Sequence, residues 1–223
     1  MKNINDILFV IQARLNSQRV PKKMTKDFNG TNLFSIAIDK VLQSKIIPKE
    51  NFYVSVCEND LIEIARSKDV NIFERSYESA NNDNSLQKIY EWHDKLPYKY
   101  VVKINGCSPL LKPETIDGFV KQFIEQEEDN LFGVIETKDY YWNKDGKLVT
   151  PWPEDQTIMN TKAVEVTYKA AHTLYASRMD LIKRNMFMGD FQKEGGIKLY
   201  PMDELECFDI DYEWQFKLGE QLV

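Results

Sequence analysis

The chain has 223 residues, of which 43% are hydrophobic and 29% charged, a composition typical of a folded protein rather than a disordered one. Its net charge of −6 argues against general binding to nucleic acid or to an anionic membrane surface. Three scattered cysteines are too few for a disulfide framework or a zinc site, and no apolar run is long enough to span a membrane. We therefore expect a cytoplasmic protein.

Short β-rich runs alternate with helical patterns along the chain. We expect strands at residues 7–12, 52–56, 70–73, 98–104, 131–136, 172–177 and 197–201. We expect helices at residues 33–44, 60–67, 85–96, 112–126, 178–185 and 212–222. This alternation predicts an α/β fold, a Rossmann-like three-layer sandwich with a mostly parallel sheet.

The pattern changes at about residues 137–172, where aromatic and β-branched residues flank the turn signal Asp145-Gly146. We interpret this segment as a small β-rich insertion within a single domain that spans residues 1–223. Its aromatic side chains are candidates for a dimer contact, because aromatic residues dominate interface energetics. These are Tyr140, Tyr141, Trp142 and Trp152.

A cluster of cations without any acid follows the first predicted strand, in the stretch "ILFVIQARLNSQRVPKKMTK". The carboxyl edge of an open α/β sheet is where such folds bind ligands, and arginine and lysine suit phosphate oxygens. The loop contains neither G-x-G-x-x-G nor G-x-x-x-x-G-K-[ST], so a standard dinucleotide or P-loop cradle is disfavoured. The cluster is either a phosphate site or a solvated basic surface that pairs with the surplus of acids.

Two carboxylates, Asp209 and Asp211, lie near the end of the chain. In an extended backbone both side chains point to one side, where they repel each other unless a cation lies between them. Mg²⁺ is the expected cofactor, since it is commonly bound by one or two carboxylates together with phosphate oxygens and water. The alternative is that Asp211 caps the last helix while Asp209 is solvated.

Several segments together resemble the cytidylyltransferases that make CMP-activated acidic sugars, the CMP-acylneuraminate and CMP-Kdo synthetases. The stretch "IQARLNSQRVPKKM" is similar to their signature loop, with matches at Ala13, Arg14, Ser17, Pro21 and Lys23. Further similar stretches are "NGTNLFSIAIDKV", "FERSYESANNDNSLQ", "VVKINGCSPLLKPETID" and "CFDIDYEWQFKLGE". They occur in the family's order over nearly the whole chain.

The resemblance implies a CTP-dependent nucleotidyltransferase that uses Mg²⁺, forms a homodimer and serves capsule or lipopolysaccharide biosynthesis. It implies catalytic roles for Arg14, Lys23, Asp209 and Asp211, the last two as metal ligands. The nucleotide-binding residues that it implies are Ala13, Arg14, Ser17, Arg19, Lys23, Arg75, Asp83 and Ser108. Candidates for binding the anionic acceptor are Asn105, Lys162, His172 and Arg178, although a structural role is the commoner one for a histidine such as His172, and such cations are more often ordinary surface charges.

Departures from the family pattern concern mainly the acceptor. Met24 follows the loop lysine where these enzymes usually have Asn, and the turn "NGCSP" stands where many have Gln-Pro-Thr-Ser-Pro. A sugar hydroxyl requires a general base, whereas a phosphate needs only a cationic pocket. The acceptor is therefore either a sugar acid or a phosphorylated small molecule such as phosphoglutamine. A metal-dependent glycosyltransferase and a non-catalytic nucleotide-binding protein are the alternative functions.

Overall fold

The computed structural model describes residues 1–82 and 84–223. Seven strands form one sheet in the order β3-β2-β1-β4-β6-β5-β7. The strands are β1 (Ile7–Gln12), β2 (Phe52–Val56), β3 (Asn71–Glu74), β4 (Tyr100–Ile104), β5 (Leu131–Thr137), β6 (Thr167–Arg178) and β7 (Leu199–Met202). Strand β6 runs antiparallel to β4 and β5, and the other pairs are parallel, which confirms the predicted α/β fold with a mostly parallel sheet.

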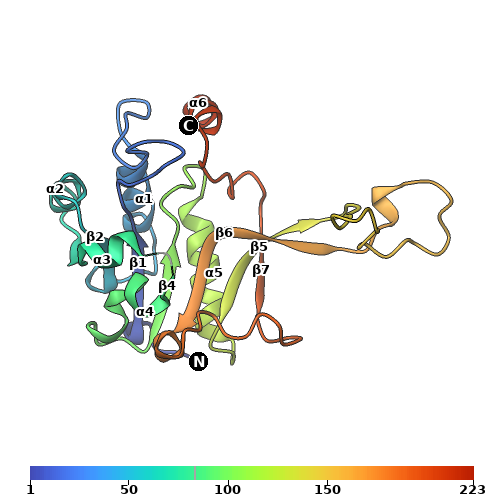
Figure 1. Cartoon of the computed structure of the whole chain (residues 1–223). Helices are drawn as coiled ribbons and strands as arrows, with labels where there is room; N and C mark the ends of the chain where they lie inside the picture. Colours follow the sequence, from blue (N-terminus) through green and yellow to red (C-terminus); the bar gives the residue numbers. More distant parts are fainter. Residues whose placement is uncertain (83) are drawn as a thin grey trace.

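Helices cover both faces of the sheet (Figure 1). They are α1 (Leu33–Leu42), α2 (Asn59–Ser67), α3 (Tyr77–Asn81), α4 (Leu86–Ile89), α5 (Pro113–Glu125) and α6 (Glu213–Leu222). One core joins α1, α2, α5 and α6 to the face of β1 that carries Phe9 and Ile11. The second core lies on the opposite face, where Leu8 and Val10 pack with the buried side chain of Trp92. No helix in the described part of the chain is long and apolar enough to cross a membrane.

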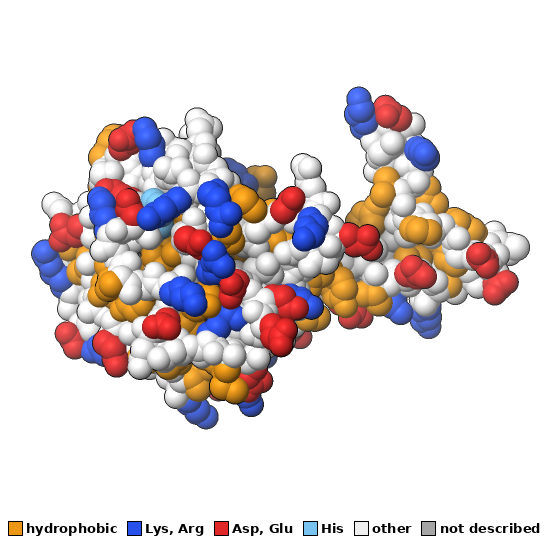
Figure 2. Space-filling view, turned by 90° about the horizontal axis from the view of Figure 1, so that it is seen from below, with side chains coloured by type: hydrophobic (Ala, Val, Ile, Leu, Met, Phe, Trp, Pro, Cys, Tyr) orange, Lys and Arg blue, Asp and Glu red, His pale blue; other side chains and the backbone are white. Residues whose placement is uncertain are grey.

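A long segment, residues 138–166, leaves the sheet between β5 and β6 and projects from the body as an arm (Figures 1 and 2). Tyr140 is its buried centre, and the backbone N–H of Asn160 donates to the tyrosine hydroxyl at 3.1 Å. The strand-like pairing expected around Asp145-Gly146 is limited to a bridge between Trp142 and Leu148 within the described residues of the arm.

A bulge in β6 shapes the edge of the sheet beside this arm. The pairing of β5 with β6 shifts register between Phe132 and Val134, and His172 has a left-handed backbone with φ of 56°. Gly133 opposes the bulge, and a Cβ there would lie 3.2 Å from the carbonyl oxygen of Leu174. A bulge redirects the side chains that it carries, so His172 is aimed differently from its neighbours on the strand.

Candidate functional site

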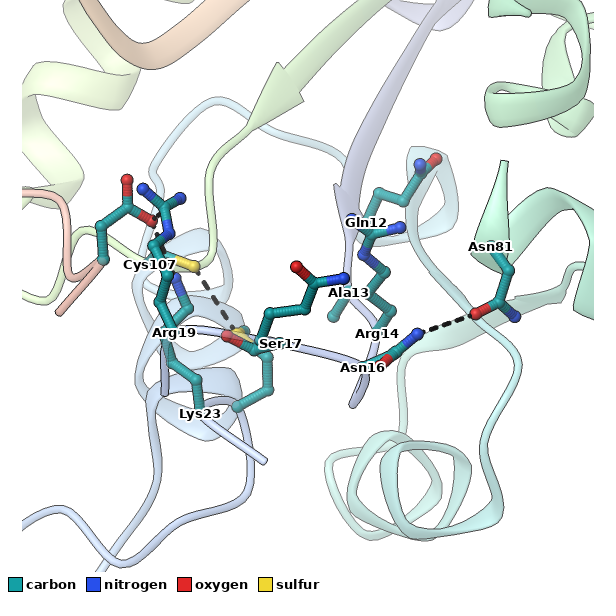
Figure 3. A pocket seen from close by; sticks show the side chains of 12 residues that line it. Gln12, Ala13, Arg14, Asn16, Ser17, Arg19, Lys23, Asn81 and Cys107 are labelled. Atoms are coloured by element: carbon teal, nitrogen blue, oxygen red, sulfur yellow. Dashed lines mark hydrogen bonds and ion pairs between the residues drawn. The ribbon is translucent and has the colours of Figure 1, made fainter. Parts of the chain in front are cut away.

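The site is built around the loop that follows β1. Residues 13–26 leave the carboxyl end of the strand and turn back toward α1 (Figure 3). Lys22, directly after Pro21, has a left-handed backbone with φ of 52°. This turn places Lys23 against the body of the protein, where its side chain is 10% exposed. A cation so deeply buried cannot belong to an ordinary solvated basic surface.

Contacts with α2 and α3 fix the start of this loop. The backbone N–H of Leu15 donates to Glu58 Oε1 at 2.8 Å, and Arg14 donates to the carbonyl oxygen of Ala80 at 3.1 Å. Asn16 Nδ2 donates to Asn81 Oδ1 at 3.1 Å, as the dashed line in Figure 3 shows. The loop is therefore held from two elements that are distant in sequence.

The cations of the loop meet the end of the chain at Asp211. The guanidinium of Arg19 lies 2.8 Å from Asp211 Oδ1, and Lys23 Nζ lies 3.4 Å from the same oxygen. Lys23 also donates to the carbonyl oxygen of Ile210. Because Ile210 is fully buried, its backbone provides a fixed anchor for the lysine. Residues about 190 positions apart thus form one cluster of opposite charges, as the sequence predicts.

Asp209 lies beside this cluster on the same segment. Burial raises the pKa of its carboxyl group, and the neighbouring charge of Asp211 raises it further, while Lys23 and a hydrogen bond from Asn105 act in the opposite direction. Asn105 Nδ2 donates to Asp209 Oδ1 at 3.3 Å and to the carbonyl oxygen of His172 at 2.9 Å. A carboxylate that is destabilised by its neighbour is suited to binding a cation.

A cavity of about 540 Å³ opens over the loop, between the end of β1 and Asp211. Figure 3 shows side chains of the loop, of α3 and of the turn after β4 around it. Its lining residues are Gln12, Ala13, Arg14, Asn16, Ser17, Gln18, Arg19, Lys23, Met24, Asn81, Cys107 and Asp211. The volume is in the range of sites for small molecules and cofactors.

A smaller cavity of about 300 Å³, lined by residues of β5, β6 and the segment before α6, also includes Asp211. Its lining residues are Ile135, Lys169, Ala170, Ala171, His172, Glu204, Cys207, Phe208, Asp209, Asp211 and Gln215. The two cavities share Asp211, so a ligand of each would meet at this carboxylate.

The structure brings most of the predicted nucleotide-binding residues together. Ala13, Arg14, Ser17, Arg19 and Lys23 all line the larger cavity. Arg75 lies behind them, buried, and donates to the carbonyl oxygen of Ala13 at 2.6 Å. Asp83 lies outside the described residues.

Ser108 does not face the larger cavity as expected. Its hydroxyl is buried with no hydrogen-bond partner in the described structure, and its carbonyl oxygen accepts from Lys40 Nζ at 3.2 Å. Cys107, one residue earlier, takes the position in the cavity wall. Lys40 of α1 holds the turn at residue 108 through this hydrogen bond, and the side chain of Ser108 therefore points inward.

The predicted acceptor residues separate into two groups. Asn105 and His172 lie beside Asp209, at the carboxyl end of β4. Arg178 lies at the opposite end of β6, in register with Tyr100, where it pairs with Asp180 at 2.5 Å and with Asp129 at 3.4 Å. Lys162 is exposed on the arm. The antiparallel direction of β6 explains why Arg178 is remote from His172.

Sequence reasoning missed several residues of the cavity walls. Gln12 ends β1 and accepts a hydrogen bond from Trp92 Nε1 at 3.0 Å, and Asn81 comes from α3, a helix that was not expected. Lys103 on β4 lines a further cavity next to Arg14. A lysine within the apolar run "VVKI" is the signal that would have drawn attention to it.

Comparison with known proteins confirms the resemblance drawn from the sequence. The family model described as cytidylyltransferase matches residues 8–222. The spore coat polysaccharide biosynthesis protein SpsF of Bacillus subtilis is 23% identical over 58% of this chain. The match spans about half (54%) of the length of SpsF. The post-translational flagellin modification protein B of Campylobacter coli is 23% identical over 99% of this chain and 96% of its own. The pseudaminic acid cytidylyltransferase of Campylobacter jejuni is 25% identical over 66% of each chain.

Solved structures share the fold. A CMP:2-keto-3-deoxy-manno-octonic acid synthetase complexed with CTP superposes with a TM-score of 0.70 at 12% identity and covers 97% of this chain and 98% of its own. A 4-diphosphocytidyl-2C-methyl-D-erythritol synthase from Anaerococcus prevotii gives a TM-score of 0.67 at 15% identity, covering 97% and 95%. Because the family model spans nearly the whole sequence, this chain belongs to the cytidylyltransferase family and is a nucleotidyltransferase.

Proposed function

We propose that this protein transfers CMP from CTP to a small anionic acceptor and releases pyrophosphate, as a step in surface polysaccharide biosynthesis. The observation that carries this proposal is the meeting of Arg19 and Lys23 with Asp211 in the wall of one cavity. Cations and carboxylates that converge on one cavity suit a polyphosphate and its metal ion. The acceptor is a sugar acid or a phosphorylated small molecule such as phosphoglutamine.

In this proposal the loop after β1 binds the triphosphate. Arg14, Arg19 and Lys23 would hold the phosphate oxygens and stabilise the negative charge that gathers on the departing pyrophosphate. A bound triphosphate would draw Arg19 and Lys23 away from Asp211, which would release that carboxylate for other contacts. Positioning and electrostatics carry most of the catalysis in phosphoryl-type transfer, so the loop needs no covalent role.

Asp209 and Asp211 are the proposed ligands of Mg²⁺. The burial of Asp209 and its repulsion by Asp211 fit a cation between them. The described residues contain no group of three or more His, Cys, Asp or Glu side chains arranged around a metal position. The remaining ligands would therefore be phosphate oxygens and water, the usual arrangement for Mg²⁺. When bound, the ion would neutralise charge on the α-phosphate.

The cytosine would lie on the α3 side of the cavity, where Arg75 fixes the backbone of Ala13 and the backbone at residues 80–82 is close to Arg14. The acceptor would lie on the other side of Asp211, next to Asn105 and His172. A relative named as acting on a sugar acid, pseudaminic acid, supports an anionic acceptor. We propose further that the enzyme works in the cytoplasm, as a homodimer formed through the arm.

Pyrophosphate release from CTP and Mg²⁺ tests this function with three acceptors: 3-deoxy-manno-octulosonate, pseudaminate and phosphoglutamine. We expect release with at least one of them, and a loss of roughly 10²- to 10³-fold in kcat for Asp211→Asn. Glu213→Gln is the matched control, because Glu213 also pairs with a loop cation, Lys26, but lies outside the cavity. Failure of the wild-type protein to bind CTP at millimolar concentration would refute the proposal.

A further inference from the structure

Lys103 is a charged residue on the face of β4 that is otherwise apolar. Val101, two residues earlier on the same face, is fully buried in the core with Leu8, Val10 and Trp92. Lys103 is in register with Val10 on β1 and with Tyr175 on β6. Its side chain therefore starts from the middle of the sheet and reaches the carboxyl edge, where the two proposed ligands would lie.

The ammonium group of Lys103 has few partners. Its Nζ lies 4.5 Å from the centre of the Tyr175 ring, and in the described structure it has no hydrogen bond to an oxygen and no ion pair. Burial lowers the pKa of Lys103 to about 8, and the nearby Cys107 and Asp209 only partly offset this effect. A half-buried ammonium without an oxygen partner is costly for the folded protein, so a ligand that supplies one would be bound well.

The cavity that Lys103 lines also contains two arginines. It measures about 240 Å³, and its lining residues are Gln12, Arg14, Arg75, Ser79, Ala80, Asn82, Ile89, Tyr90 and Lys103. Among the lining residues that the structure describes, three side chains are cationic, those of Arg14, Arg75 and Lys103, and none is acidic. Arg75 donates to the carbonyl oxygen of Ala13 and Arg14 to that of Ala80, so the backbone already engages both guanidinium groups.

Lys103 is connected to the proposed acceptor side. The Tyr175 ring that lies beside its ammonium carries a hydroxyl 3.4 Å from His172 Nδ1. Asn105 follows Lys103 by two positions, directly after the end of β4, and its side chain donates a hydrogen bond to Asp209 at 3.3 Å. Alternation along a strand places Lys103 and Asn105 on the same face. Lys103 itself lines the cavity on the α3 side, and its neighbours Tyr175 and Asn105 contact His172 and Asp209 of the proposed acceptor side.

We propose that Lys103 is a specificity-determining residue that binds the anionic group of the acceptor, a carboxylate or a phosphate. This inference rests on the proposed cytidylyl transfer and adds the residue that would select an acidic acceptor over a neutral one. The rival occupant is the nucleotide itself, whose base carbonyl would also accept a hydrogen bond from the ammonium.

The test compares Lys103→Met with Lys103→Arg. Methionine keeps an apolar stem against Tyr175 but removes the charge, whereas arginine keeps the charge. Lys198→Met is the matched control, since it gives the same net charge and removes a lysine that pairs with Glu128 away from the cavities. The KM for each of the three acceptors and the Kd for CTP are measured for all four proteins.

We expect Lys103→Met to raise the KM for the acceptor roughly 10- to 100-fold, the effect of losing a hydrogen bond to a charged group, with the Kd for CTP within about twofold of wild type. Lys103→Arg should restore most of the affinity. The acceptor whose KM rises, one of the two sugar acids or phosphoglutamine, is the acceptor whose anionic group Lys103 binds. The inference would be overturned if Lys103→Met weakened CTP binding as much as acceptor binding, or if it left the acceptor KM unchanged. Pyrophosphate release by the wild-type protein would still support the transfer reaction in either case.

If no acceptor gives turnover, calorimetric binding of the same three anions to the complex of protein and CTP provides the readout. Binding by wild type and by Lys103→Arg, with weaker binding by Lys103→Met, would support the role of Lys103. Absence of binding to the wild-type complex would refute an anion site here, and CTP binding would separate that failure from a failure of the nucleotide site.

Discussion

At the scale of single residues, the pKa of Asp209 is set by opposing effects: burial and Asp211 raise it, whereas Lys23 and the hydrogen bond from Asn105 lower it. Asp209 is kept near Asp211 although burial and repulsion both raise its pKa. The raised pKa means that the folded state binds the proton more tightly than the unfolded chain does, whose aspartates titrate near 3.9. The stabilisation by this group is complete below that unfolded value and is lost as the pH rises through the folded pKa.

Asp209→Asn should therefore raise the stability of the protein at pH 7, while it abolishes one proposed metal ligand. The amide cannot ionise, and its oxygen can still accept the hydrogen bond from Asn105. We expect a rise in Tm on the order of 1–3 °C at pH 7 that vanishes below about pH 3.5. Thermal unfolding followed by circular dichroism across this range measures it. Asp203→Asn makes the same change at an exposed position and should leave Tm unchanged; a lower Tm for Asp209→Asn at pH 7 would contradict the argument.

Sequence reasoning at this scale succeeds where residue type and position carry the chemistry. The convergence of Lys23 with Asp211 follows from a basic loop after the first strand and a carboxylate pair near the end of the chain. The sequence does not predict that Ser108 points inward, because this orientation depends on a contact between the 108–109 turn and Lys40 of another helix. The sequence does not predict the environment of Lys103, because that environment depends on which strand lies next to β4.

At the scale of elements, the docking of α6 keeps Asp211 close to the cations of the loop after β1. The buried ring of Phe216 packs edge-on against Phe28, with the ring centroids 5.1 Å apart. Gly219 permits this approach, since a Cβ there would lie 3.1 Å from both Phe28 and Ile210. Helix α6 begins two residues after Asp211, so its docking against Phe28 fixes the position of Asp211 relative to the loop that carries Arg19 and Lys23.

Phe216→Ala should destabilise the protein and weaken nucleotide binding together. Loss of a fully buried phenylalanine costs about 3–5 kcal/mol, and the contact that it removes is the one between α6 and the segment after the loop. Urea unfolding and the Kd for CTP, measured where the variant is still folded, check both effects. Leu218→Ala on the same helix is 39% exposed and should change neither by much. Unchanged CTP affinity in folded Phe216→Ala would show that the docking of α6 does not set the site.

The elements themselves were predicted best where one pattern dominates. The run "ILFVIQ" and the apolar stripe of α5 lie where expected. The helix expected at 85–96 is instead divided into α4 and a 3-10 helix, Glu91–Asp94, because Tyr90 leaves the helical conformation with ψ of 51°. The break lies beside Trp92, which is fully buried and bonded to Gln12. Tertiary packing of one tryptophan outweighs the local helical preference here.

At the scale of the whole molecule, the arm (residues 138–166) contributes no residue to the two hydrophobic cores that flank the sheet in the described structure. Its centre is packed around Tyr140, but large apolar side chains remain on its surface, among them Val149 at 64%, Ile158 at 71% and Met159 at 58% exposure. Figure 2 shows hydrophobic atoms gathered along the projection. An apolar surface that extends from a compact body is typical of a region that another chain covers.

A second copy of the chain is the occupant that the proposed homodimer requires, and the arm can be tested directly. We expect the wild-type protein to sediment at about twice the chain mass of 26.2 kDa, and the double variant Val149→Asp and Ile158→Asp to sediment as a monomer, because two charges cannot be desolvated at an apolar interface without partners. Leu222→Asp places a charge at an exposed leucine of α6 and should leave the dimer intact. Sedimentation velocity over a concentration series distinguishes the two states. A monomeric wild-type protein at high micromolar concentration, or a double variant that still dimerises, would remove the arm from the assembly and leave its apolar surface to a different partner.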